Sequence, residues 1–172
     1  VDVTAANTNT IKYKDFLKAN GKVLKNNYGQ GDTVYLRGTN AGGYMLQEFW
    51  MTPTSYTTNV SDQMDIINTL TSRFGSSAAR TLIDTYERNY WTESDFNTCA
   101  SLGINCIRLP LWYRNFVDEN NNWYSNAFER VDWFVEQAGK RGMYVIIDMH
   151  GAYGSQNGSD HSGVDGGNNK QG

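Results

Sequence analysis

Polar side chains of three kinds stand at the ends of apolar runs in this sequence. Arg108 lies within the run 103–113, and Asp148 and His150 end the run 143–150. Burying Arg108 unpaired would be costly, so we expect it to meet a carboxylate or to face a polar cleft. Asp148 and His150 are two positions apart, so on a strand both point to one face. Guanidinium, carboxylate and imidazole groups together suit the binding of hydroxyl groups.

Three other chemistries compete for these residues. A metal site could use the four residues Asp148, His150, Asp160 and His161. The chain has neither His-x-His nor His-Glu-x-x-His, so this interpretation lacks a ligand motif. The glycines after His150 lack the Gly-Lys-Ser/Thr ending of a phosphate loop, and no Gly-x-Ser-x-Gly elbow supports a catalytic triad. A polar sugar site therefore remains, with 5 Trp, 11 Tyr and 7 Phe available for stacking.

The elements that would position these residues alternate between strands and helices. A hairpin at 16–26, around Asn20-Gly21, precedes a strand at 33–40. Helical spacing predicts helices over 62–74, 78–90, 92–102 and 127–142. The continuous apolar runs 103–113 and 143–150 predict buried strands, the first ending near Pro110 because proline has no backbone donor.

This order predicts βαβ units with a parallel sheet, that is, an α/β fold. Three strands are too few for a full α/β domain. We therefore expect residues 1–172 to be the N-terminal portion of one (β/α)8 TIM barrel, with about three βα units after the hairpin. The carboxyl ends of its strands bring Asn40, Arg108, Asp148 and His150 to one edge. The polar run 151–163 that follows is expected to bury little and to wall the sugar site.

The composition excludes several classes of function. The net charge is −3 and no basic block exists, so no nucleic-acid partner is expected. No apolar stretch is long enough for a membrane helix, so no membrane partner is expected either. Cys99 and Cys106 lack the Cys-x-x-Cys spacing, and two buried free thiols are the expected state.

Three segments together resemble glycoside hydrolase family 5. They are GTNAGGYMLQEFWMTP (38–53), WTESDFNTCASLGINCIRLPLWY (91–113) and DMHGAYGSQNGSDHSG (148–163). Within the family, the sequence is most similar to exo-β-1,3-glucanases, over roughly residues 17–165. The resemblance implies a (β/α)8 barrel that hydrolyses β-glucosidic bonds with retention and without a cofactor, in a secreted, extracellular protein.

The resemblance also implies roles for particular residues. Arg108 would sit near the nucleophile and hold it ionised, and His150 would contact the sugar at the site of cleavage. Glu48 and Asp160 would bind hydroxyl groups of the terminal glucose. The expected substrate-binding residues are Glu48, Trp50, His150, Asn157, Asp160 and His161.

Two departures from the pattern leave alternatives open. Ser159 and His161 stand where the exo-glucanases carry an aromatic residue and an asparagine, so a cellulase-like endo-β-1,4-glucanase is an alternative. A non-catalytic carbohydrate-binding protein is another. The chain has no Asn-Glu-Pro, and its last glutamate, Glu136, lies in an expected helix. We therefore predict that it lacks both catalytic glutamates and is inactive alone. Its expected partners are a β-glucan and the missing C-terminal half of the barrel.

Overall fold

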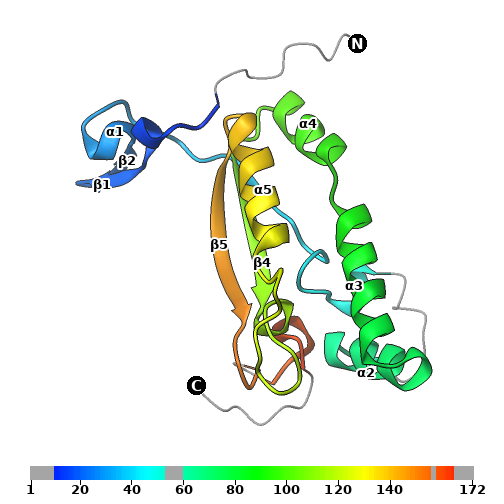
Figure 1. The fold of residues 1–172 in the computed structure, drawn as a ribbon. Coiled ribbons are helices and arrows are strands. Elements are labelled where there is room, and N and C mark those ends of the chain that lie inside the picture. Colours follow the sequence, from blue (N-terminus) through cyan, green and yellow to red (C-terminus); the bar gives the residue numbers. More distant parts are fainter. Residues whose placement is uncertain (1–9, 53–59, 156–157, 165–172) are drawn as a thin grey trace. The chain divides into compact units, whose positions relative to one another are not determined.

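The computed structural model describes residues 10–52, 60–155 and 158–164 (Figure 1). The chain divides into two compact units. The first contains residues 1–39, 93–107 and 131–146, and the second contains residues 40–92, 108–130 and 147–172. The boundaries between the units fall within the strands Cys106–Trp112 and Tyr144–Gly151. The sheet is described first, and the rest of each unit is then described by itself.

A parallel three-stranded sheet confirms the α/β prediction. Its strands lie in the order β3 (Gly38–Asn40), β4 (Cys106–Trp112) and β5 (Tyr144–Gly151). Sequential order with intervening helices is what the first units of a (β/α)8 barrel require. The side chains of Ile107, Leu109, Leu111 and Trp112 on the central strand β4 are all at most 2% exposed.

Two predicted strand boundaries were wrong. Residues 33–37 do not extend β3, because other partners take their backbone groups: Val34 donates to the carbonyl of Leu24 at 2.8 Å, and Arg37 donates to the Asn105 side chain at 2.7 Å. β4 also continues past Pro110 to Trp112. Pro110 has no backbone N–H, but none is needed on the side of β3. β3 ends at Asn40, and the next residue, Ala41, donates its backbone N–H to the carbonyl of Arg108, before Pro110 is reached.

The first unit holds the predicted hairpin, the short helix α1 (Asn26–Gly29), the helix α4 (Glu93–Ser101) and most of the helix α5 (Glu129–Lys140). β1 (Lys18–Asn20) pairs antiparallel with β2 (Val23–Lys25), which α1 follows. α4 contacts α5 through Phe96, which is fully buried with its ring centroid 4.8 Å from that of Phe134. Cys99 and Cys106 are free and buried, as predicted.

The second unit holds two packed helices, α2 (Gln63–Phe74) and α3 (Ser76–Tyr90). The Asp62 carboxylate caps α2 by accepting a bond from the backbone of Asp65 at 2.8 Å. Gly75 separates the helices with a φ of 81°, a conformation that glycine tolerates best. The structure confirms both helices, although α3 begins two residues earlier than the predicted 78.

A buried polar network lies in the second unit. Arg130 donates to the hydroxyl of Tyr44 from Nε at 3.1 Å and from Nη2 at 2.8 Å. Its Nη2 also donates to the carbonyl of Glu87 at 3.2 Å. Asn115 donates to the Glu87 carboxyl at 3.3 Å and to the carbonyl of Met45 at 2.8 Å. The network ties α3 to the start of α5 and to the segments that flank β3 and β4.

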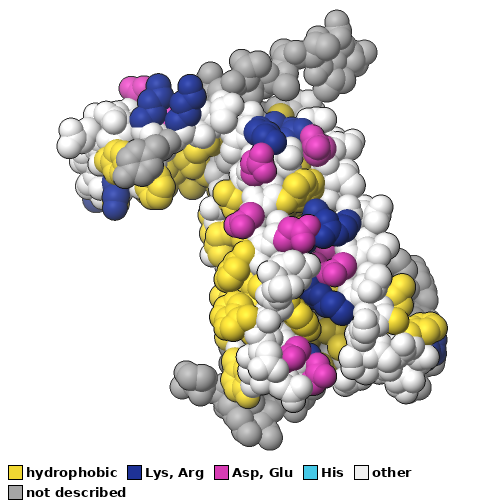
Figure 2. Space-filling model, viewed as in Figure 1, with side chains coloured by type: hydrophobic (Ala, Val, Ile, Leu, Met, Phe, Trp, Pro, Cys, Tyr) yellow, Lys and Arg dark blue, Asp and Glu magenta, His cyan; other side chains and the backbone are white. Residues whose placement is uncertain are grey.

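β5 exposes apolar side chains on both of its faces: Ile147 and Met149 on one, and Ile146 on the face of Asp148 and His150. The side chains of Ile146, Ile147 and Met149 are 47%, 51% and 46% exposed. β5 is also the last strand of the described sheet. Figure 2 shows hydrophobic side chains gathered along the strand. Within the described residues, no helix is long and apolar enough to cross a membrane.

Candidate functional site

Arg108 is the centre of a cluster at the carboxyl ends of the strands. Its Nη2 donates to the Asp148 carboxylate at 2.5 Å and lies 2.9 Å from Nδ1 of His150. Its Nη1 donates to Asn40 at 3.4 Å. Asp148 and His150 share a face of β5, as predicted, and Nδ1 of His150 lies 3.1 Å from Oδ2 of Asp148. The guanidinium therefore pairs with a carboxylate, one of the two outcomes expected for Arg108, and its side chain remains 35% exposed.

The donors and acceptors of this cluster fix the role of the imidazole. A guanidinium has only donors, so a neutral His150 accepts the bond from Arg108 at Nδ1 and carries its proton on Nε2. The His150 side chain is 25% exposed. It can thus present an N–H donor held by a charged partner to a ligand hydroxyl.

His161 is brought next to His150. Their ring centroids lie 5.4 Å apart with an interplanar angle of 46°. His161 and Asp160 belong to the one-turn 3-10 helix Asp160–Ser162, and both are partly buried. The structure thus places His161 against the strand-end cluster, with Asp160 as its chain neighbour.

Glu48 and Trp50 form a second pair of predicted site residues. The indole Nε1 of Trp50 donates to the Glu48 carboxylate at 3.0 Å. Trp50 lies in the one-turn 3-10 helix Phe49–Met51, and its side chain is 59% exposed. An exposed ring beside a carboxylate combines a stacking face with a hydroxyl acceptor. The remaining predicted residue, Asn157, lies outside the described residues.

The segment after β5 buries more than its polar sequence suggested. Ser155 and Ser162 are 1% and 0% exposed, and their hydroxyl oxygens lie 2.6 Å apart. Ser155 also donates to the carbonyl of Val164 at 2.9 Å. The expectation that residues 151–163 bury little was therefore wrong, because paired hydroxyls and glycines let this backbone fold inward.

Gly151 illustrates how closely this segment packs. A Cβ at Gly151 would lie 2.4 Å from the indole Cδ1 of Trp112 and 2.9 Å from the carbonyl oxygen of Ser162. Trp112 is fully buried and cannot move aside cheaply. We expect Gly151→Ala to destabilise the fold by about 3 kcal/mol, measured by denaturant unfolding.

Gly139→Ala is the matched control for this substitution. A Cβ at Gly139, within α5, would lie 4.0 Å from the Cβ of Ile11, an ordinary contact. We expect it to be neutral or to stabilise the fold by up to about 1 kcal/mol, since alanine favours helices. Equal effects of the two substitutions would contradict the packing argument.

Sequence reasoning missed one aromatic pair at the strand ends. Tyr113, directly after β4, and Tyr153, shortly after β5, stand edge to face with ring centroids 5.2 Å apart. Tyr153 is 56% exposed. The position of each tyrosine just beyond a strand end was the available signal.

The metal alternative gains no support from the geometry. The described residues contain no group of three or more His, Cys, Asp or Glu side chains arranged to hold a metal ion. Asp148 instead pairs with Arg108, and a guanidinium cannot be a metal ligand.

Comparison with known proteins gives a consistent picture. The family model described as Cellulase (glycosyl hydrolase family 5) matches residues 64–169. The chain is 37% identical over 131 residues to a glucan 1,3-beta-glucosidase of Blumeria graminis, covering 74% of this chain and 30% of that protein. It is 32% identical to a glucan 1,3-beta-glucosidase of Candida oleophila, covering 75% of this chain and 32% of that protein.

A solved structure shows the same fold. The crystal structure of rutinosidase from Aspergillus niger aligns with a TM-score of 0.64 at 24% identity, over 76% of this chain and 37% of that one. The chain thus spans about a third of the length of the relatives it matches.

Proposed function

Because the chain belongs to glycosyl hydrolase family 5, we propose that the whole protein is a secreted enzyme that hydrolyses β-1,3-glucans with retention of configuration. The observation that carries the proposal is the Arg108–Asp148–His150 cluster at the carboxyl ends of β4 and β5. Active sites of (β/α)8 barrels are built at that end of the strands. The names of the relatives from Blumeria graminis and Candida oleophila support the substrate class.

In this proposal the chain supplies binding and positioning groups. His150 donates from Nε2 to a glucose hydroxyl, with its ring held by Arg108. Glu48, Asp160, His161 and Asn157 bind further hydroxyls, and Trp50 stacks on a sugar face. The guanidinium of Arg108, still 35% exposed, adds positive charge beside the reacting carboxylate.

Retaining hydrolysis needs two carboxyl groups about 5 to 5.5 Å apart, one as nucleophile and one as acid and base. We propose that both are glutamates in the part of the barrel that this chain does not span. The reaction then requires no cofactor, because the two carboxyl groups supply the nucleophile and the proton.

The test compares the whole protein with the 172-residue chain. We expect the whole protein to release glucose from laminari-oligosaccharides, with the β-anomer appearing first by proton NMR, and the chain alone to release none. Preferential cleavage within cello-oligosaccharides would favour the endo-β-1,4-glucanase alternative. A whole protein that binds these glucans without cleaving them would establish a carbohydrate-binding role instead.

A further inference from the structure

A cavity of about 210 Å³ lies in the second unit and shares no residue with the strand-end cluster. Its apolar part comes from α2 and α3, through the side chains of Met64, Ile67, Ala79 and Ile83. A second part comes from the segment after β4, which contributes Arg114, Glu119 and Tyr124. The cavity therefore offers a ligand an apolar surface on one part and polar groups on another.

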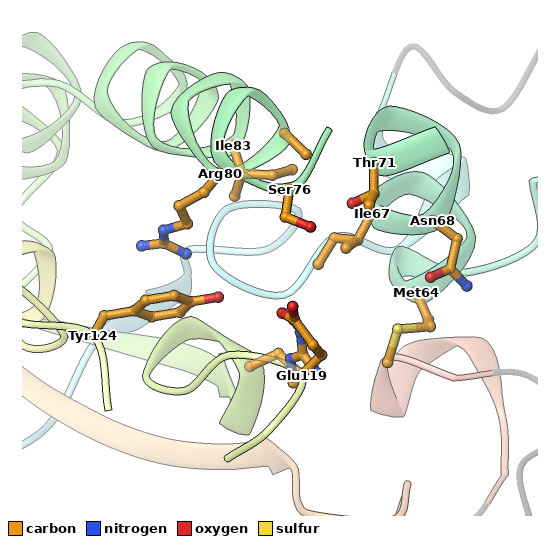
Figure 3. Close-up of a pocket in the computed structure, with 11 residues that line it drawn as sticks. Met64, Ile67, Asn68, Thr71, Ser76, Arg80, Ile83, Glu119 and Tyr124 are labelled. Carbon is orange, nitrogen blue, oxygen red and sulfur yellow. The ribbon is translucent and has the colours of Figure 1, made fainter. Parts of the chain in front are cut away.

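The polar groups at the cavity have hydrogen-bonding capacity to spare. Among the described residues, the structure gives no hydrogen-bond partner to the side-chain hydroxyls of Thr71, Ser76 and Tyr124. Figure 3 shows the hydroxyls of Ser76 and Tyr124 and the carboxylate of Glu119 directed toward the same space. Ser76 is exposed, so this space is open to solvent. A hydroxyl can both donate and accept, so these groups can bond to ligand hydroxyls in either direction.

The charges at the cavity compensate one another in pairs. Arg80 binds Asp84 at 2.7 Å, and Arg114 lies 3.9 Å from Glu119. The second distance is too long for a hydrogen bond, so the carboxylate of Glu119, whose side chain is 61% exposed, keeps its oxygens free to accept from a ligand. Because each positive charge has a negative one beside it, the cavity favours a neutral ligand over an ion.

We propose that this cavity binds one neutral hexopyranose, and that its ligand is D-glucose, the sugar that the proposed reaction releases. A pyranose ring has an apolar face of C–H groups and a rim of hydroxyls, which match the apolar and the polar parts of the cavity. The face rests on Ile67 and Ile83, and the hydroxyls bond to Ser76, Tyr124 and Glu119. Only the choice of glucose among hexoses rests on the proposed function.

The size of the cavity agrees with this ligand. An enclosed cavity of about 150 Å³ is enough to hold benzene. A hexose has about twice as many non-hydrogen atoms as benzene, which suits a larger cavity that is open on one side. The space of about 210 Å³ meets both conditions.

Isothermal titration calorimetry of the whole protein with D-glucose tests the proposal. The titration uses a His150→Ala background, which weakens sugar binding at the strand-end cluster, so that the cavity dominates the signal. We expect saturable binding with a Kd of about 10 mM. Glucuronate has the same ring and one negative charge that the cavity does not balance, so it should bind at least ~10-fold more weakly.

Single hydroxyl deletions locate the binding. Ser76→Ala and Tyr124→Phe should each weaken glucose binding about 5-fold, because each removes one neutral hydrogen bond and leaves the rest of the side chain in place. Ser77→Ala is the matched control, since Ser77 lies beside Ser76 in the first turn of α3 but does not line the cavity.

Weaker binding in Ser76→Ala and Tyr124→Phe, with Ser77→Ala unchanged, would establish the site. Absence of saturable binding up to about 50 mM glucose, or glucuronate that binds as tightly as glucose, would overturn the proposal. If Tyr124→Phe proves unfolded by circular dichroism, Ser76→Ala decides alone, and an affinity equal to that of Ser77→Ala counts against the site. Hydrolysis of laminari-oligosaccharides is assayed separately with His150 intact. A protein that cleaves none of them but binds glucose in this pattern would keep the cavity site and lose the proposed function.

Discussion

Replacing Arg108 by methionine should lower kcat for the proposed β-glucan hydrolysis by the whole protein about 100-fold, with a much smaller change in KM. Arg108 holds the imidazole of His150 at 2.9 Å and the carboxylate of Asp148 at 2.5 Å. Without the guanidinium, the imidazole can carry its proton on Nδ1 and donate it to Asp148, 3.1 Å away, so Nε2 no longer offers a donor to the sugar. Loss of one hydrogen-bond donor aimed at the reacting group costs about 10²- to 10³-fold in kcat.

Two companion variants make this prediction specific. Arg108→Lys should restore little activity, because a lysine ammonium lacks the planar fork that reaches two partners at once. Arg88→Met should leave kcat unchanged, since Arg88 forms an exposed ion pair with Glu129, 45% and 48% exposed. Steady-state kinetics and thermal unfolding are measured together. A folded Arg108→Met protein with kcat within about 3-fold of the original would refute the positioning role.

Glu87→Gln should change the pH dependence of stability more than any surface substitution. Glu87 is 1% exposed, and its Oε2 has no hydrogen-bond partner among the described residues. Burial raises the pKa of the Glu87 carboxyl from 4.5 to about 7, despite the opposing charges of Arg80 and Arg130. The folded protein therefore keeps this proton up to about pH 7, whereas the unfolded chain releases it near pH 4.5.

The sign of the effect follows from these two pKa values. Between pH 4.5 and 7 the folded state binds more protons, so the contribution of Glu87 to stability falls as the pH rises through this window. A glutamine at this position does not ionise, so its contribution to stability does not fall as the pH rises. We expect Glu87→Gln to be more stable than the original protein at pH 8 by about 3 kcal/mol, and equally stable near pH 4.

Urea unfolding at several pH values measures this difference. Glu136→Gln is the control, because Glu136 is 61% exposed and, among the described residues, pairs only with Lys140 across one helical turn. Its stability should track the original protein at every pH. A Glu87→Gln difference that stays constant from pH 4 to pH 8 would show that the carboxyl does not titrate with folding.

The strand-end cluster could be predicted from sequence because its signals are local. Asp148 and His150 share a face through the two-residue period of a strand, and Arg108 had to find a charged or polar partner once buried. Which carboxylate it would find was not predictable. The pairing with Asp148 depends on the register between β4 and β5, which neither strand encodes alone.

The errors have a common physical origin. The β3 boundary was missed because Asn105 and Leu24, distant in sequence, take the backbone bonds of residues 33–37. The network of Tyr44, Glu87, Asn115 and Arg130 was missed for the same reason, since its members come from four separate segments. The polar run 151–163 appeared unable to pack because hydroxyl pairing, as between Ser155 and Ser162, is invisible in composition.

The exposed apolar residues of β5 have a consequence for synthesis. Relatives are about three times as long as the matched region, so in a protein of that length the ribosome still has most of the chain to make when β5 emerges. At about 5 to 20 residues per second, that interval lasts tens of seconds. During this time Ile146, Ile147 and Met149 remain exposed, beside a strand edge that has no partner among the described residues. An open strand edge is a template for pairing with other chains, so this is the interval in which the nascent protein is most exposed to aggregation.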